Sequence, residues 1–222
     1  MIASPARIIG GIRVGSVAPL GPRRVPSGFV KHPVAGRIVV DTLGVAGDAQ
    51  ADRRVHGAPD KAVYAYPASG YPAWRAAMPQ HADRLVDGAM GENLTVDGWN
   101  DADVTIGDIV RLGSAVLQVT EPRTPCYKLG LRFADPAMIR TFGELGISGW
   151  YYRVVEGGTI AADDSLTCID RPNPDWTVTR FFAVITRGTV GDEDLAAIAG
   201  LRGVSDGWRL KALRLLARRG AA

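Results

Sequence analysis

The stretch that most directly indicates the fold reads Val104-Thr105-Ile106-Gly107-Asp108-Ile109-Val110-Arg111-Leu112-Gly113-Ser114-Ala115-Val116-Leu117-Gln118-Val119-Thr120. Two runs rich in β-branched and aliphatic residues, 104–112 and 115–120, are separated by the turn signal Leu112-Gly113-Ser114. Gly107-Asp108 is a second turn signal, inside the first run. The stretch therefore predicts closely spaced strands joined by tight turns.

Similar short apolar runs flank this stretch on both sides. They predict further strands at 8–17, 37–40, 93–96, 151–156 and 166–170. Two helices are expected between them, at roughly 67–78 and 136–145. Gly and Pro together number 41 (27 and 14), which favours turn-rich β architecture. Because strands and helices do not alternate regularly, the pattern predicts a mostly β barrel or sandwich over residues 1–170.

The pattern changes at Arg171-Pro172-Asn173-Pro174-Asp175, where two prolines predict a stiff connector. After it, apolar residues recur at helical spacing, and Ser205 is positioned to cap the last of three short helices. These helices predict a small C-terminal domain over residues 171–222. So short a domain buries little apolar surface alone. We therefore expect five of its side chains to pack together and partly against the barrel: Phe181, Phe182, Leu195, Trp208 and Leu213.

Composition narrows the class of protein. Of 222 residues, 46% are hydrophobic and 22% charged, which is ordinary for a soluble globular chain. No apolar run reaches the roughly 18 residues that a membrane span needs, and we expect no export signal and a cytoplasmic location. Two cysteines cannot form a disulfide framework. The net charge of +3 does not by itself indicate a nucleic-acid partner.

The densest polar cluster is Gly47-Asp48-Ala49-Gln50-Ala51-Asp52-Arg53-Arg54-Val55-His56-Gly57-Ala58-Pro59-Asp60-Lys61-Ala62-Val63. A loop rich in Arg, His and Lys offers several donors to an anion, and small residues let a phosphate approach the backbone. The same composition is also typical of a solvated loop with local ion pairs. These residues alone do not decide between an anion-binding loop and a solvated loop.

The second cluster is Glu121-Pro122-Arg123-Thr124-Pro125-Cys126-Tyr127-Lys128-Leu129, directly after the strand expected at 115–120. Cys126 lies between two cationic residues, and positive neighbours favour the thiolate, which is the form that binds soft metals. The alternative is a half-buried structural cysteine. Cys168, within an apolar run, is expected in the core.

Together these clusters resemble the successive motifs of MOSC domains (molybdenum cofactor sulfurase C-terminal domains). The resemblance rests on four segments in order, 47–63, Gly91-Glu92-Asn93-Leu94, Ile106-Gly107-Asp108 and 121–129. Order and spacing are most similar to the bacterial YiiM-type branch, whose members carry a C-terminal three-helix domain. Pro26-Ser27-Gly28 also resembles that branch. The resemblance implies a MOSC β-barrel followed by three helices.

The resemblance also implies roles for individual residues. Cys126 stands at the position expected to coordinate molybdenum. The set expected to bind the molybdenum cofactor (molybdopterin) comprises Arg54, His56, Lys61, Asn93, Arg123, Thr124 and Lys128. Asn93 either bonds the pterin edge or orients its loop, and Asp48 is an ion-pair candidate. His56, with Asp48, is a candidate proton donor. Ala49 and Ala58 depart from the family, whose members often have Gly there.

The implied activity is reduction of small N-hydroxylated compounds, such as hydroxylaminopurines or amidoximes. Two electrons and two protons would break the N–O bond to give an amine or amidine and water. Basic residues of the last helix could steer a flavodoxin-like or ferredoxin-like electron donor. The alternative is a solvated face that only keeps the protein soluble. The alternative to a reductase is a molybdopterin-binding or sulfur-carrier module holding a persulfide on Cys126. Monomer and homodimer both remain open.

Overall fold

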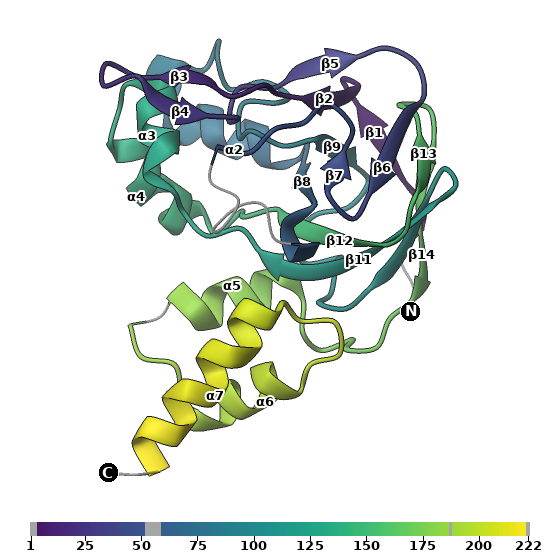
Figure 1. Cartoon of the computed structure of the whole chain (residues 1–222). Coiled ribbons are helices and arrows are strands. Elements are labelled where there is room, and N and C mark those ends of the chain that lie inside the picture. The colour runs from purple at the N-terminus through teal and green to yellow at the C-terminus, as the bar shows by residue number, and fades with distance from the viewer. Residues whose placement is uncertain (1–3, 52–58, 187, 221–222) are drawn as a thin grey trace.

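A closed barrel forms the body of the molecule. The computed structural model describes residues 4–51, 59–186 and 188–220. Within them, seven strands close in the order β1-β14-β10-β11-β12-β8-β9 (Figure 1). Their bounds are β1 Ala6–Ile9, β8 Val63–Pro67, β9 Leu94–Asp97, β10 Ile109–Leu112, β11 Ala115–Pro122, β12 Trp150–Glu156 and β14 Ser165–Asp170. All neighbours pair antiparallel except β8 and β9, which are parallel. The expected mostly β barrel is confirmed.

Two expected strands are shorter than their apolar runs, because glycines interrupt them. In the run 8–17, Gly10 and Gly11 have φ values of +64° and +84°, which separates β1 from β2 (Ile12–Val14). In the run 104–112, Gly107 has a φ of +88° and the strand β10 begins only at Ile109. Positive φ is accessible to glycine without steric cost, so these turns end the strands there.

Three small sheets lie beside the barrel, and all their strands except one come from residues 12–45. They are the pair β2–β5 (His32–Val34), the hairpin β3–β4 (Ala18–Leu20, Val25–Ser27), and the sheet β13-β6-β7 (Gly158–Ile160, Ile38–Asp41, Gly44–Val45). Only β6 among these was expected as a separate strand. The others are two to three residues long, too short for a period-2 pattern to be visible.

Helices cover one end of the barrel around a second apolar cluster. They are α2 (Gly70–Ala77), α3 (Tyr127–Phe133) and α4 (Ala137–Leu145), with the 3-10 turns η1 (Pro59–Lys61) and η2 (Pro79–His81). Trp74 of α2 and Phe142 of α4 are fully buried there, with ring centroids 6.2 Å apart. Helices were expected near α2 and α4. The seven-residue α3, placed directly after Cys126, was not.

The C-terminal helices α5 (Val178–Thr186), α6 (Asp192–Gly200) and α7 (Asp206–Gly220) pack beneath β11 (Figure 1). Ser205 caps α7 as expected, because its Oγ accepts a hydrogen bond from the Trp208 amide at 3.3 Å. Phe181 lies in the same apolar cluster as the barrel core. The helices thus share a core with the barrel, and their division into a separate domain stays a prediction.

Of the five side chains expected to pack together, three are buried and Trp208 is half-buried against Phe181. Phe182 is one of the buried three, but it packs in the second apolar cluster, where its ring centroid lies 6.0 Å from that of Phe142. The expectation for Leu213 was wrong. Its side chain is 49% exposed, because it lies on the same outward face of α7 as Leu210 and Arg214. No helix among the described residues is both long and apolar enough to cross a membrane.

Replacing Phe181 by Ala should test the shared core. Its ring contacts Trp176 (6.0 Å) and Trp208 (5.6 Å), and we expect the free energy of unfolding to fall by about 3–5 kcal/mol. Urea denaturation followed by tryptophan fluorescence should show one cooperative transition shifted as a whole. Leu213→Ala is the control, with a change of at most about 0.5 kcal/mol. A separate early transition of the helices in Phe181→Ala would contradict the shared core.

Candidate functional site

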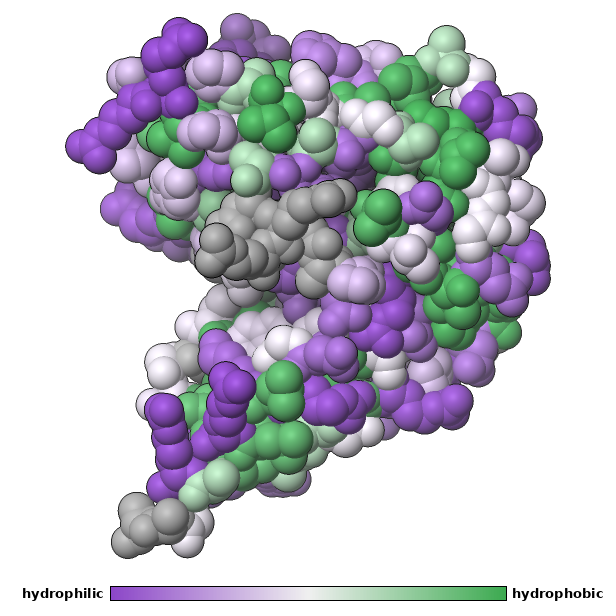
Figure 2. Space-filling view, in the orientation of Figure 1, coloured by the Kyte–Doolittle hydropathy of each residue, from purple (hydrophilic) through white to green (hydrophobic). Residues whose placement is uncertain are grey.

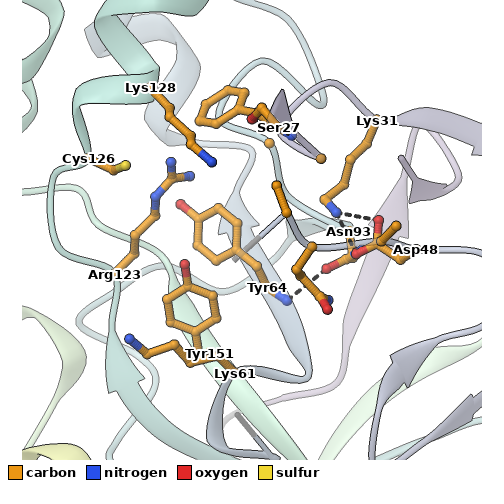
Figure 3. Close-up of a pocket in the computed structure, with 16 residues that line it drawn as sticks. Ser27, Lys31, Asp48, Lys61, Tyr64, Asn93, Arg123, Cys126, Lys128 and Tyr151 are labelled. Carbon is orange, nitrogen blue, oxygen red and sulfur yellow. Dashed lines mark hydrogen bonds and ion pairs between the residues drawn. The ribbon is translucent and has the colours of Figure 1, made fainter. Parts of the chain in front are cut away.

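A pocket lies between the barrel and the helices that cover its end. Its walls come from segments far apart in sequence. Figure 3 shows that Lys61, Tyr64, Arg123, Cys126, Lys128 and Tyr151 point into it. Three of these side chains are cations, one is a thiol and two are phenols. The pocket is therefore built to receive a ligand that is anionic and has flat, apolar parts.

Arg123 is the most buried cation of the pocket, with 7% of its surface exposed. It follows β11 directly, and its guanidinium lies over the rings of Phe29 (5.1 Å) and Tyr64 (4.8 Å). It donates a hydrogen bond to the carbonyl of Met90. In the described part of the chain, no carboxylate forms an ion pair with Arg123. A buried charge is costly without a counter-charge, so this guanidinium favours a bound anion.

Two lysines face the same space. Lys128, in the first turn of α3, donates to the carbonyl of Pro26 at 3.1 Å, and it too has no ion-pair partner among the described carboxylates. Lys61 pairs with Glu121 (Nζ–Oε1 2.9 Å). Burial alone would lower the pKa of Lys61, but Glu121 outweighs it and the pKa is raised. Both lysines therefore supply positive charge to the pocket.

Cys126 is half-buried at the N-terminal flank of α3, with an extended backbone (φ −126°, ψ 137°). Its sulfur points toward the guanidinium of Arg123 (Figure 3). The thiol forms no disulfide. Cys168, by contrast, is in the barrel core as expected, 4% exposed. The described residues contain no group of three or more His, Cys, Asp or Glu placed as a metal site, and a metal at Cys126 stays a prediction.

Asp48 closes the opposite side of the pocket. Its carboxylate forms an ion pair with Lys31 and accepts hydrogen bonds from the Gly15 amide (2.7 Å) and Asn93 Nδ2 (3.0 Å). Burial lowers the pKa of Lys31, and Asp48 opposes that shift. Asp48 is thus an ion-pair partner as expected, and its partner among the described residues is Lys31.

Asn93 joins three segments at the pocket floor. Its Oδ1 accepts from the Tyr64 amide (3.0 Å), and its Nδ2 donates to the Arg13 carbonyl (3.0 Å) as well as to Asp48. Both ends of the amide are engaged within the protein. The geometry therefore gives Asn93 the orienting role, and a contact with a cofactor stays a prediction.

The loop before Asn93 is held by Glu92, which is fully buried. Its carboxylate accepts hydrogen bonds from the amides of Gly88 (2.7 Å) and Met90 (3.1 Å), and from the hydroxyls of Tyr71 and Thr95. This fixes the Met90 carbonyl that receives Arg123. A Cβ on Gly28, across the pocket, would come within 1.8 Å of the Ala49 carbonyl, so only glycine fits there.

The structure brings most of the predicted site residues together. Lys61, Asn93, Arg123, Cys126 and Lys128 line one pocket. Thr124 is exposed and lines only an adjoining outer chamber, which shares Cys126 and Lys128 with the pocket and adds Val25, Pro26 and Tyr127. Arg54 and His56 lie outside the described residues.

The sequence pattern did not identify two aromatic walls, Tyr64 and Tyr151. Tyr64 belongs to β8, whose five residues are all buried, so no alternation marked which side chain faces the site. Two further tyrosines of the second apolar cluster, Tyr66 and Tyr71, do not line the pocket; Tyr66 accepts a hydrogen bond from Trp74 Nε1 (2.7 Å). Tyr151 stands between Trp150 and Tyr152 in β12, so the sequence does not mark which of the three aromatic side chains faces the pocket.

Comparison with known proteins agrees with this geometry. The MOSC domain family matches residues 52–167. Protein YiiM of Escherichia coli (strain K12) is 36% identical over 187 residues, which is 84% of this chain and 83% of that protein. A protein of Gibberella moniliformis named "Reductase" is 38% identical over 162 residues, 72% of this chain and 29% of that larger protein.

A solved structure shows the same architecture over almost the whole chain. YiiM from Geobacillus stearothermophilus superposes with a TM-score of 0.79 at 28% identity, and the match covers 96% of this chain and 100% of the other. Described residues of three motif segments, 47–63, 91–94 and 121–129, line the pocket, whereas Ile106-Gly107-Asp108 lies outside it, where Asp108 pairs with Arg171. The barrel with three C-terminal helices is common to both structures. The chain belongs to the MOSC domain family, in its YiiM-type branch.

Proposed function

We propose that this chain binds the molybdenum cofactor in the pocket and uses it to reduce small N-hydroxylated compounds, such as hydroxylaminopurines or amidoximes. MOSC domains are associated in general with this cofactor, and a relative named "Reductase" supports an oxidoreductase. The observation that carries the proposal is the convergence of a free thiol, Cys126, with Arg123 and Lys128, whose positive charges face the same space.

The side chains of the pocket fit the parts of that cofactor. Its phosphate is an anion, which suits Arg123 and Lys128, since neither pairs with a carboxylate of the described residues. Its metal accepts soft sulfur ligands, which suits the Cys126 thiol. Its flat pterin suits the aromatic walls of Tyr64 and Tyr151. When bound, the group supplies two-electron redox chemistry at molybdenum.

The protein then has to admit the substrate and deliver protons. The outer chamber opens beside Cys126 and is bordered by Tyr127, whose side chain is 56% exposed and available to a planar substrate. Reduction of R–NHOH consumes two electrons and two protons and releases R–NH2 and water. Asp48 is a poor proton donor, because its oxygens accept from Gly15, Lys31 and Asn93. Lys61, whose pKa is raised, stays protonated at neutral pH and borders both chambers.

The C-terminal helices offer a surface for an electron donor in the cytoplasm. Arg214 and Arg218 are exposed on α7 beside Leu210 and Leu213, which are 50% and 49% exposed. Hydrophilic and apolar surface lie side by side on these helices (Figure 2). Such a basic face with apolar contacts complements an acidic flavodoxin-like or ferredoxin-like protein. We include that class of donor in the proposal.

Replacing Cys126 by Ser should abolish reduction of an amidoxime and leave the fold intact, because a hydroxyl ligates a soft metal poorly. The protein is produced in a host that makes the molybdenum cofactor, and its metal and pterin contents are measured together with turnover. Cys168→Ser is the control and should affect stability at most. Near-normal turnover by Cys126→Ser would refute the ligand assignment. Cyanide-labile sulfur in a wild-type chain without turnover would instead favour the sulfur-carrier alternative.

Replacing Arg123 by Gln should weaken cofactor retention roughly tenfold to hundredfold, since a charge-assisted hydrogen bond contributes about 1.5–3 kcal/mol. Retention is measured as pterin remaining after extensive dialysis. Arg84→Gln is a matched control, because Arg84 also lies over an aromatic ring (Phe133, 4.8 Å) and donates to backbone carbonyls, yet does not line the pocket. Equal losses in both variants would show a general effect on folding.

Charge reversal at Arg214 and Arg218 to Glu should slow reduction by an acidic protein donor, and more so at low ionic strength, where charges are screened less. Reduction by a small dye should be unchanged, because a dye does not need the docking surface. Initial rates at several salt concentrations measure the effect. Equal loss with both donors would rule out docking at α7.

A further inference from the structure

A line of buried contacts runs from the C-terminal helices into the pocket. Ser205, the cap of α7, donates its hydroxyl hydrogen bond to Glu121 Oε2, and Glu121 Oε1 pairs with Lys61 Nζ at 2.9 Å. Ser205 is 1% exposed and Glu121 5%. The carboxylate is therefore held from both sides, by the helix end on one and by the pocket lysine on the other.

A second contact ties the same two parts together. The amide of Asp206, the first residue of α7, donates to Asp60 Oδ2 at 2.8 Å, and Asp60 Oδ1 pairs with Arg153 at 2.7 Å. Asp60 precedes Lys61 in η1. The short turn that carries the pocket lysine is thus hydrogen-bonded directly to the N-terminus of α7.

We propose that Ser205 acts through Glu121 as a positioning residue for Lys61, so that the C-terminal helices set the affinity of the pocket for an anion. The inference rests on the anion-binding part of the proposed function. It gives the three helices a role in the site itself, in addition to their packing against the barrel.

The loss of anion affinity expected without the Ser205 hydroxyl follows from the two contacts of the Glu121 carboxylate. With the Ser205 hydroxyl in place, part of the carboxylate's hydrogen-bonding capacity is satisfied on the helix side, and Oε1 holds Lys61 in one position. Without that hydroxyl, the carboxylate loses one of its two fixed contacts and draws the ammonium toward itself. Lys61 then presents less positive charge to a ligand, and anion affinity falls.

Inorganic pyrophosphate is a suitable probe, used with the full chain made in a host that lacks molybdopterin. Ser205→Ala should weaken pyrophosphate binding, measured by calorimetry, roughly three- to tenfold, the range of one hydrogen bond of about 1 kcal/mol. Ser205→Thr keeps the hydroxyl and should bind like the wild type. In a Lys61→Gln background, Ser205→Ala should cause no further loss, because the group that it positions is gone.

Arg219→Ala separates positioning from simple loosening of the helices. Arg219, at the far end of α7, pairs with Asp192 and donates to the Val190 carbonyl (2.8 Å), and it does not contact the pocket. This variant should destabilise the helices yet leave pyrophosphate binding unchanged. Thermal unfolding of every variant checks that each is folded under the conditions of the pyrophosphate-binding measurement.

Three results would overturn the inference: unchanged binding in Ser205→Ala, an equal loss with and without Lys61, or no pyrophosphate binding by the wild type. Failure of the proposed function looks different. A chain that shows the Ser205–Lys61 coupling but neither retains molybdenum nor reduces an amidoxime would refute the reductase proposal and leave this inference standing.

Discussion

The pocket depends most on the network of hydrogen bonds around the Asp48 carboxylate, which also pairs with Lys31. Asp48 and Asn93 connect β2 and the turn after it, the start of the basic loop, and β8, which are distant in sequence. Each polar atom in this network is buried and has a partner, so removing one member would leave another unsatisfied at a cost of about 1–3 kcal/mol. Such a network rigidifies the pocket before any ligand binds, and it leaves the cations on the opposite wall to make the contacts with ligand.

The pocket cations therefore divide into two kinds. Lys31 and Lys61 each have a buried carboxylate partner, Asp48 and Glu121, which offsets part of the positive charge and holds the ammonium in place. Arg123 and Lys128 bond to backbone carbonyls of Met90 and Pro26 instead. A carbonyl orients a cation without neutralising it. The protein thus holds two positive charges in a fixed place for a ligand, and the fold supplies the energy that keeps them there.

The sequence predicted the barrel, the C-terminal helices and five residues that line the pocket, because four motifs in order resemble one family. The clustered cations and the lone cysteine by themselves had left a solvated loop and a structural cysteine open. It did not predict Tyr64, since the fully buried strand β8 shows no polar alternation, nor Tyr151, which stands between two other aromatic residues in β12. The coupling of Ser205 to Glu121 was equally invisible, because it joins residues 84 positions apart. Leu213 was misplaced because an apolar residue in a short amphipathic helix can face solvent or core, and spacing alone does not say which.

The single parallel pair in the barrel, β8 with β9, has a kinetic consequence. Parallel neighbours need a long crossover connection, and here that connection, residues 68–93, carries α2 and the Glu92 loop back to the pocket. The pocket walls then come from non-local contacts, such as Arg13 with Asn93 and Lys61 with Glu121, which form slowly during folding. The binding site is accordingly complete only when the barrel has closed. A ligand that contacts several of these walls cannot be held before they have come together, so loading belongs to the folded molecule.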